Sequence, residues 1–241
     1  MNKNTKISKN NFKVIQTQDY QGFSFAAFQE TLKLTKGSRQ KLLVLPTGNT
    51  PTGFYQEFTK YLLKNLKEKK RFFFTNLDEY LDIPQNSKIS FQSYLKRNIS
   101  KKLKLSNRNF YWINNKSHIE IEKGKINFII KKFKKIDLCI LGLGKNGHIA
   151  FNEPGCDWNL DFFDTPLSRT TKNSLKNLSY KISHGRTLGI KTILSSKKIL
   201  LLVSGSGKEI ALKKLLQKKI DTKFPVTSLI KHPNLTIIID R

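Results

Sequence analysis

A buried strand that breaks into a glycine-rich loop constrains this chain more than any other feature of its sequence. The mostly apolar run 136–141 is typical of a buried strand, and the loop 142–155 follows it with the sequence Gly-Leu-Gly-Lys-Asn-Gly-His-Ile-Ala-Phe-Asn-Glu-Pro-Gly. This loop delivers three polar side chains, Asn146, His148 and Glu153, soon after the strand ends. Because ligands of open α/β sheets sit beyond the carboxyl ends of strands, the pattern predicts a functional site here.

The three side chains suit acid–base chemistry. His148 is a candidate proton donor and acceptor, and Glu153 could orient or charge its imidazole. Asn146 can hold one imidazole tautomer through a neutral hydrogen bond. The alternative is an ordinary turn with a satisfied histidine. The glycines and polar partners around His148 favour the site.

Two other buried strands also run into glycine-containing loops that precede helices. The strand Lys41–Leu45 leads into the loop 46–53, and the strand 198–203 leads into Ser-Gly-Ser-Gly-Lys at 204–208. Backbone N–H groups at such helix starts can bind phosphate, and Lys208 could add a point charge. The loop 46–53 lacks the Gly-Lys-Ser/Thr ending of a P-loop. Each loop could also be an ordinary turn, with Lys208 as a surface lysine.

A carboxylate follows another predicted strand, 71–76. The strand runs into Leu-Asp-Glu-Tyr at 77–80, which puts Asp78 at its carboxyl end. A carboxylate in this position can act as a base, although an Asp-Glu pair at a strand end is often a solvated turn.

Strand-like and helix-like runs alternate throughout, which indicates an α/β fold. No linker or repeat divides the 241 residues, so we expect a single domain over 1–241. We expect the segment 157–180 to be the least regular part. The remaining predicted strands are Phe12–Thr17, 110–113 and Leu235–Asp240. Two predicted helices start at the capping residues Asp19 and Ser90, and the others cover about 54–66, 119–133, about 187–194 and Glu209–Leu216. In the helix 119–133 we expect Ile121, Ile126 and Ile130 to face inward.

Basic residues greatly outnumber acidic ones. The chain has 45 Lys and Arg residues against 17 Asp and Glu residues, a formal net charge of +28. Taken alone, this balance indicates nucleic-acid binding. The charge is mostly lysine spread over many helix-like segments, and codon bias in an AT-rich genome would produce it without any function. We therefore expect no specific nucleic-acid partner, although a basic field would help to attract an anionic small substrate.

The cysteines and the other histidines predict no metal site. Cys139 and Cys156 form neither a disulfide framework nor a zinc cluster, and they fit a reducing compartment. His118, His184 and His232 lack metal-ligand spacing, so we interpret them as structural or exposed. The first eleven residues contain no apolar signal segment, and no apolar run approaches a membrane span. We expect a cytoplasmic protein with no membrane partner.

Together these loops resemble the glucosamine-6-phosphate deaminase family, also called isomerase. The matching segments occur in the family's order and at about its spacings over most of the chain: 45–51, 76–80, 141–155 and Lys208 with its loop. The string Gly-His-Ile-Ala-Phe-Asn-Glu-Pro is specific. The related 6-phosphogluconolactonases share the fold and the Gly-His, but they usually lack the Phe-Asn-Glu-Pro and tend to have Asp-Glu-Arg in place of Asp-Glu-Tyr.

The resemblance implies a Rossmann-like, doubly wound αβα sandwich with a mostly parallel sheet. It also implies conversion of a 2-amino-2-deoxyhexose 6-phosphate into a ketohexose 6-phosphate and ammonia, without metal or other cofactor. His148 would open the pyranose ring with support from Glu153 and Asn146, and Asp78 would move a proton between C2 and C1. The residues expected to bind substrate phosphate are Thr47, Gly48, Asn49, Thr50 and Lys208. We expect a monomer or a homo-oligomer.

The chain departs from the family pattern in three respects. Asn146 stands where some members have Asp, so Glu153 must stabilise an imidazolium. The lid segment 157–180 looks shorter than usual. The basic cluster for allosteric activation in the regulated hexamers is not apparent.

Two further features leave questions open. The lid arginine that binds phosphate in some members is not matched: Asn177 falls near its place, and Arg169 or Lys172 could substitute. The segments 185–191 and 202–205 resemble the galactosamine-6-phosphate branch as much as the glucosamine branch, which leaves the C4 stereochemistry of the substrate open.

Three alternatives compete with the deaminase interpretation. One is a sugar-phosphate lactonase on the same fold, which would open a lactone with water and need no proton transfer at C2. Another is a nucleic-acid-binding module, suggested only by the charge. The last is a pseudoenzyme or sugar-phosphate sensor, which the departures in the lid keep open.

Overall fold

Seven strands pair in parallel to form the central sheet of the computed structural model, which describes residues 12–175 and 180–240. Their order across the sheet is β1-β10-β9-β6-β2-β3-β5. The predicted mostly parallel sheet is therefore confirmed. The strands are β1 (Phe12–Thr17), β2 (Lys41–Leu45), β3 (Phe72–Asn76), β5 (Phe110–Tyr111), β6 (Leu138–Gly142), β9 (Ile199–Val203) and β10 (Leu235–Asp240).

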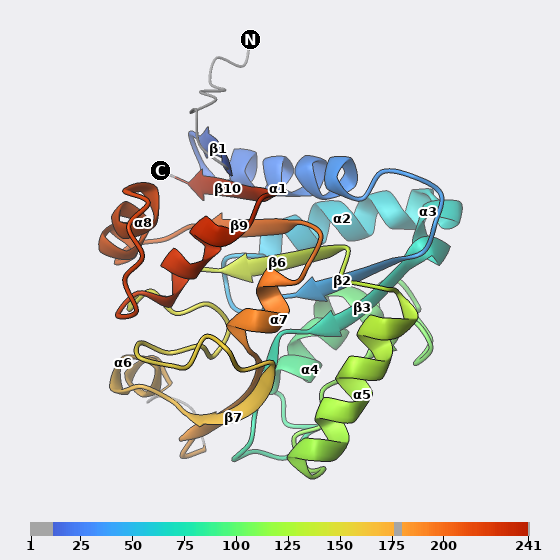
Figure 1. Ribbon diagram of the computed structural model, residues 1–241. Helices are drawn as coiled ribbons and strands as arrows, with labels where there is room; N and C mark the ends of the chain where they lie inside the picture. The colour runs from blue at the N-terminus through green and yellow to red at the C-terminus, as the bar shows by residue number, and fades with distance from the viewer. Residues whose placement is uncertain (1–11, 176–179, 241) are drawn as a thin grey trace.

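Helices cover both faces of this sheet (Figure 1). One apolar cluster joins the strands to α1, α2 and the α4 segment, and the other joins them to α5, α7 and α8. Every residue of β2 and β9 is buried, as expected for parallel strands covered on both sides. The helices are α1 (Tyr20–Leu34), α2 (Thr52–Lys64), α3 (Leu66–Arg71), α4 (Phe91–Leu95), the π-helix η1 (Lys96–Ser100), α5 (Ile119–Lys132), α6 (Arg169–Ser174), α7 (Ile190–Leu194), α8 (Glu209–Leu216) and the 3₁₀ helix η2 (Pro225–Lys231).

Short polar side chains start two of these helices. The Asp19 carboxylate accepts a hydrogen bond from the Gly22 N–H at 2.7 Å, and the Ser90 hydroxyl accepts one from the Ser93 N–H at 3.0 Å. Both caps were predicted and are confirmed. Each satisfies a backbone donor that has no partner inside its helix.

A second, antiparallel sheet was not predicted. It consists of β4 (Asp78–Tyr80), β8 (His184–Leu188) and β7 (Phe162–Pro166). The segment 157–180, expected to be the least regular, thus contains β7 and α6 in its described part. The expected helix 187–194 was wrong at its start, because Thr187 and Leu188 belong to β8 and the helix begins only after Gly189. Asn177 lies outside the described residues.

The inward face of α5 was also predicted incorrectly at one position. Ile121 is 66% exposed, whereas Ile126 is buried. Glu122 is buried in place of Ile121, because its carboxylate accepts hydrogen bonds from the Asn114 N–H at 2.9 Å and the Lys125 amine at 3.4 Å. At this position α5 therefore turns the hydrogen-bonded Glu122 toward the protein interior, where the sequence had predicted Ile121.

The sheet order places four loops at one edge. Strands β9, β6, β2 and β3 are parallel neighbours, so their carboxyl ends lie side by side. The loops 204–208, 142–155 and 46–53 and the Asp78 segment follow these ends. The topology therefore gathers the predicted site segments at a single edge, where open α/β sheets bind ligands.

Candidate active site

A cavity of about 240 Å³ opens at this edge of the central sheet. The predicted segments supply most of its wall: the loop after β2, the Asp78 segment and the loop after β6. Side chains from α4 and α6 complete it. The lining residues are Pro46, Thr47, Gly48, Asn49, Thr50, Leu77, Asp78, Tyr80, Phe91, Gly142, Leu143, Gly144, His148, Ala150, Phe151, Thr171 and Leu175.

Two tyrosines hold the loop after β2 by its carbonyl groups. The Tyr94 hydroxyl donates to the Gly48 carbonyl at 2.6 Å. The Tyr20 hydroxyl lies 3.0 Å from the Asn49 carbonyl and 3.1 Å from the Thr50 carbonyl. Gly48 has a φ of +92°, which favours glycine. These contacts fix the loop from its outer side, and neither tyrosine was singled out from the sequence.

The same loop offers free backbone donors. Within the described part of the chain, the N–H groups of Gly48, Asn49 and Thr50 have no hydrogen-bond acceptor. They lie at the start of α2, where the helix dipole favours negative charge. Unpaired N–H groups at a helix start form a ready anion-binding site.

The lysine-containing loop after β9 converges on this loop, as predicted. The Lys208 amine lies 3.2 Å from the Thr50 hydroxyl and also donates to the Ser204 carbonyl. Burial lowers the pKa of Lys208, and the nearby Lys145 charge lowers it further. A second cavity of about 400 Å³ touches both loops, including Thr50 and Gly205. A bound anion here would offset the unfavourable burial of the ammonium group.

A hydrogen-bond network ties His148 to the motif that contains it. The His148 Nδ1 atom lies 3.4 Å from a Glu153 carboxylate oxygen. The Asn146 amide donates to the same oxygen at 2.8 Å, and the Asn146 carbonyl oxygen accepts from the His148 N–H at 3.2 Å. His148 lines the cavity, and Glu153 lies on the Nδ1 side of its ring. This arrangement can orient the imidazole and stabilise its charged form.

Gly144 permits the position of the imidazole. A Cβ atom on this glycine would lie 2.4 Å from the His148 ring. The Gly144 N–H also donates to the His148 carbonyl at 2.9 Å, which closes the loop. Glycine at 144 is therefore required because the ring packs directly on the backbone.

The other Glu153 oxygen is held by the segment around α6. It accepts from the Thr171 hydroxyl at 2.5 Å and from the Ser168 N–H at 3.3 Å. Burial alone would raise the pKa of Glu153, but the hydrogen bonds and charge of His148, with the bonds from Thr171 and Asn146, lower this pKa to about 2. Glu153 is therefore ionised at every ordinary pH.

Asp78 has the opposite environment. Its side chain lines the cavity, and among the described residues no hydrogen-bond donor contacts its carboxylate. Burial raises the pKa of Asp78 well above its usual range, and the charge of Glu79 adds to this shift. A buried carboxyl group with a raised pKa is a stronger base than an exposed one, which suits it to take up a proton and return it.

Glu79 is a site-forming residue that the sequence did not identify. Its carboxylate accepts hydrogen bonds from the Phe91 N–H at 2.9 Å and the Gln92 N–H at 2.8 Å, at the start of α4. Burial raises the pKa of Glu79 to about 7, against the effect of these hydrogen bonds. Glu79 thus joins the Asp78 strand to the helix that carries Tyr94. The only signal in the sequence was its position next to Asp78.

The lid segment contributes a residue other than those expected. Arg169 and Lys172 are exposed and are absent from the cavity lining, whereas Thr171 lines the cavity between them. The Ser168 hydroxyl caps α6 by accepting from the Thr171 N–H at 3.2 Å. Ser168, a residue type preferred at helix N-caps, was the signal that could have revealed the start of α6 and with it the position of Thr171.

Comparison with known proteins adds independent information. Residues 25–238 match the family model described as glucosamine-6-phosphate isomerases/6-phosphogluconolactonase. A glucosamine-6-phosphate deaminase of Oceanobacillus iheyensis is 33% identical over 235 residues, which cover 95% of this chain and 94% of that protein.

Two solved structures illustrate the range of similar folds. A monomeric glucosamine-6-phosphate deaminase superposes with a TM-score of 0.88 at 30% identity, covering 95% of this chain and 97% of that one. The 6-phosphogluconolactonase of Plasmodium vivax superposes with a TM-score of 0.79 at 17% identity, covering 98% and 93%. The lactonase likeness concerns the fold alone.

Proposed function

The chain belongs to the glucosamine-6-phosphate isomerase/6-phosphogluconolactonase family, and from this premise we propose that it converts a 2-amino-2-deoxyhexose 6-phosphate and water into a ketohexose 6-phosphate and ammonia. One observation carries the proposal. A buried Asp78 and a Glu153-supported His148 line the same cavity as the loop with unpaired N–H groups. Two separate proton carriers and an anion cradle are what this reaction needs.

The phosphate of the substrate binds between the two glycine loops. The N–H groups of Gly48, Asn49 and Thr50 donate to its oxygens, and the Lys208 amine supplies a positive charge 3.2 Å from the Thr50 hydroxyl. The tyrosine hydroxyls on the loop carbonyls keep the N–H groups in place. Anchoring the phosphate fixes the sugar relative to both proton carriers.

His148 opens the ring. The imidazole removes the proton from the C1 hydroxyl and delivers a proton to the ring oxygen, so the C1–O5 bond breaks and an aldehyde forms at C1. The carboxylate of Glu153, held ionised by its hydrogen bonds, stabilises the imidazolium that exists between these two transfers. Asn146 keeps both partners aligned through its hydrogen bonds to the Glu153 carboxylate and from the His148 N–H.

Asp78 carries out the isomerisation. Its carboxylate takes the proton from C2 of the open-chain aldehyde, giving an enolate with the amine on C2. Return of this proton to C1, with transfer of a proton from the amine to O1, produces an imine at C2 and a hydroxyl at C1. Water then adds to the imine carbon and ammonia leaves, which gives the ketone. The raised pKa of Asp78 makes its carboxylate a stronger base than an exposed aspartate.

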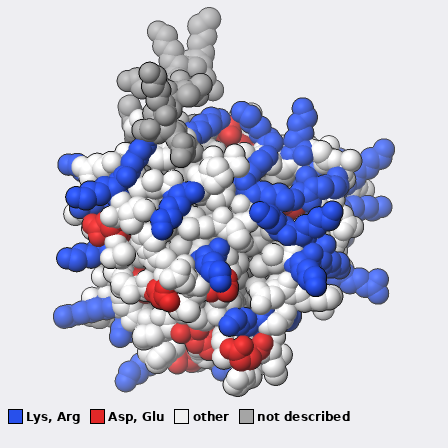
Figure 2. Space-filling model, in the orientation of Figure 1, with Lys and Arg blue, Asp and Glu red and all other residues white. Residues whose placement is uncertain are grey.

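The environment of Asp78 favours this reaction over lactone hydrolysis. Hydrolysis of a lactone requires one activated water, for which His148 would suffice. It gives no role to a second buried carboxyl group in the same cavity. Lys and Arg side chains are spread over much of the face in Figure 2 and are densest at its upper right, while most of the acidic residues lie lower on this face.

An ammonia assay tests the proposal. The purified protein would be incubated with glucosamine 6-phosphate, galactosamine 6-phosphate and, separately, 6-phosphogluconolactone. We expect ammonia and ketose phosphate in equal amounts from at least one amino sugar, and the ratio of kcat/KM values assigns the C4 epimer. Accelerated lactone hydrolysis with no ammonia from either epimer would overturn the proposal in favour of a lactonase.

A further inference from the structure

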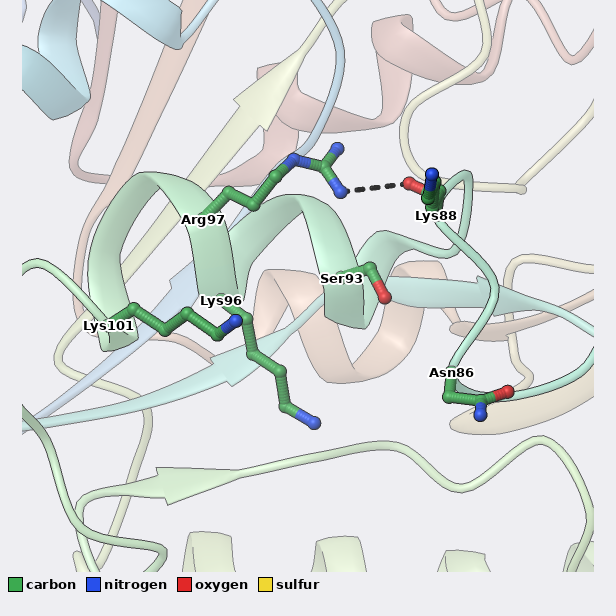
Figure 3. A pocket seen from close by; sticks show the side chains of 6 residues that line it. All are labelled: Asn86, Lys88, Ser93, Lys96, Arg97 and Lys101. Carbon is green, nitrogen blue, oxygen red and sulfur yellow. Dashed lines mark hydrogen bonds between the residues drawn. The ribbon is translucent and has the colours of Figure 1, made fainter.

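A basic pocket of about 450 Å³ lies on the surface of α4 and η1, outside the cavity described above (Figure 3). It shares no lining residue with that cavity. Four of its described lining residues are cationic and none is acidic. The cations are Lys88, Lys96, Arg97 and Lys101, and the neutral residues are Asn86 and Ser93.

The π-helix η1 brings three of the cations to this pocket. The Lys101 N–H donates to the Lys96 carbonyl at 2.9 Å, which is the five-residue spacing of a π-turn. The wider turn lets Lys96, Arg97 and Lys101 all face the pocket at the end of α4. Single π-turns of this kind are rare and occur frequently at functional sites.

Two contacts order the pocket before any ligand binds. The Arg97 guanidinium donates to the Lys88 carbonyl at 2.9 Å, which ties the loop before α4 to η1 (Figure 3). The Lys96 amine lies 5.5 Å from the centre of the Trp112 ring, a cation–π contact. Side chains that are already ordered lose less entropy when they bind a ligand.

The charge of the pocket is not neutralised within the protein. Among the described residues, none of the four cations forms an ion pair with a carboxylate. The Asn86 amide and the Ser93 hydroxyl likewise have no described hydrogen-bond partner within the protein. Clustered like charges repel one another, and an anion between them would relieve this repulsion.

We propose that this pocket binds a small anion with two or more linked phosphate groups, of the chemistry of pyrophosphate. Its volume falls within the range of small-molecule sites, about 300–1,000 Å³. Four cations carry more charge than a single phosphate group, with about two negative charges near neutral pH, can neutralise, whereas a diphosphate carries more negative charge. Asn86 and Ser93 add neutral donors to the oxygens. The site is separate from the one proposed for sugar phosphate and does not depend on that function.

Calorimetric titration with inorganic pyrophosphate tests the site. The titrated protein is the Lys208→Ala variant, which lacks the charge beside the Thr50 loop, so that the sugar-phosphate site contributes less to binding. The buffer contains 150 mM KCl, which screens long-range attraction between the basic surface and the anion. We expect saturable binding in this background. Adding Arg97→Gln and Lys101→Gln should weaken it at least about tenfold, because two charge-assisted contacts are lost. Lys96→Gln with Lys101→Gln provides a second variant that leaves the Arg97–Lys88 contact intact.

A matched pair of substitutions controls for total charge. Lys131→Gln with Lys213→Gln removes the same two charges from exposed positions on α5 and α8, and should change pyrophosphate affinity less than twofold. An equal loss in this control would overturn the proposal, as would unchanged binding in both pocket variants or no binding in the Lys208→Ala background. Equal affinity for inorganic phosphate and pyrophosphate would overturn the assigned ligand class.

Discussion

Asp78 and Glu153 are two buried carboxyl groups of one site, and their environments shift their pKa values in opposite directions. They are similarly buried, with 6% and 7% of their surface exposed. Four donor groups surround Glu153, from Asn146, His148, Thr171 and Ser168. The hydrogen bonds and charge of His148, with the bonds from Thr171 and Asn146, lower the pKa of Glu153 to about 2. No described donor contacts the Asp78 carboxylate, and burial raises its pKa. The hydrogen bonds and the charge of His148 lower the pKa of Glu153, whereas the Asp78 carboxylate has no such partner among the described residues.

The difference assigns different tasks to the two groups. A carboxylate that remains ionised can stabilise a neighbouring cation but cannot store a proton. A buried carboxyl group whose pKa is raised is a stronger base, which can accept a proton and return it. The comparison therefore supports Asp78 as the proton carrier at C2 and Glu153 as the partner of His148.

The largest effect is expected from Asp78→Asn. The amide retains the shape of the side chain but cannot act as a base, so deamination should fall at least about a hundredfold, the usual scale for loss of a general base. Ammonia release measures activity, and circular dichroism with thermal unfolding checks that the fold is retained. Near-normal turnover in a folded variant would remove Asp78 from the mechanism.

The pH dependence of the unfolding free energy tests the lowered pKa of Glu153. The folded-state pKa of Glu153 is lowered from 4.5 to about 2, so its contribution to stability is complete above about pH 5 and is lost as pH falls toward 2. Between pH 5 and 3 the wild type should lose about 2 kcal/mol more unfolding free energy than Glu153→Gln, which has no proton to bind. Urea unfolding at both pH values measures this difference, and identical pH dependence would contradict the lowered pKa.

Isotope exchange separates the two tasks directly. With an open-chain substrate analogue, deuterium exchange at C2 requires the base but not ring opening. His148→Ala and Glu153→Gln should retain most of this exchange while losing at least about tenfold in deamination, and Asp78→Asn should lose both. Equal loss of exchange in all three variants would mean that the histidine shares the chemistry at C2.

Lys208→Ala should weaken substrate binding without separating ring opening from proton transfer at C2, because the lysine is proposed to anchor the substrate and not to transfer protons. We expect binding of substrate and of inorganic phosphate to weaken together by about tenfold, with C2 exchange and ring opening retained at saturating substrate. Lys213→Ala, at an exposed position of α8, is the matched control. Weaker substrate binding with unchanged phosphate binding would argue against this anchor.

The smallest expected effect concerns Glu79→Gln. The charge of Glu79 helps to raise the pKa of Asp78, while the amide oxygen of the glutamine can still accept from one of the two α4 N–H groups that bond to Glu79. Because the base must be deprotonated, the acidic limb of the kcat/KM profile reports the pKa of Asp78, and we expect this limb to move to lower pH. A shift to higher pH would show that the two groups do not interact as described.

The sequence predicted the local features and missed the long-range ones. The bounds of β1, β2, β10 and α8 were correct, since an apolar run or a helical period is contained in the segment itself. The small antiparallel sheet was missed because its pairing joins distant segments, such as Asp78 with Thr187. The strands β4, β7 and β8 also lack an apolar run like that of β2, since their sequences are Asp-Glu-Tyr, Phe-Phe-Asp-Thr-Pro and His-Gly-Arg-Thr-Leu.

The site shows the same division: its local motifs were predictable from the sequence, and the contacts between remote segments were not. The Gly-rich loops after β2, β6 and β9 are visible as motifs, and the parallel sheet brings them together. The hydroxyls of Tyr20, Tyr94 and Thr171 were not predicted, because each acts on a segment that is remote in sequence. The pKa difference between Asp78 and Glu153 also depends on such contacts.

The position of β10 between β1 and β9 has a consequence for the order in which the protein can fold during its synthesis. β1 pairs with β10 over its whole length, from Phe12 with Leu235 to Thr17 with Asp240. β1, the first of the described strands to leave the ribosome, therefore has no partner in the sheet until β10 emerges. Until then β9 presents an open edge, which can pair with other chains. Completion of the sheet must therefore follow translation of β10.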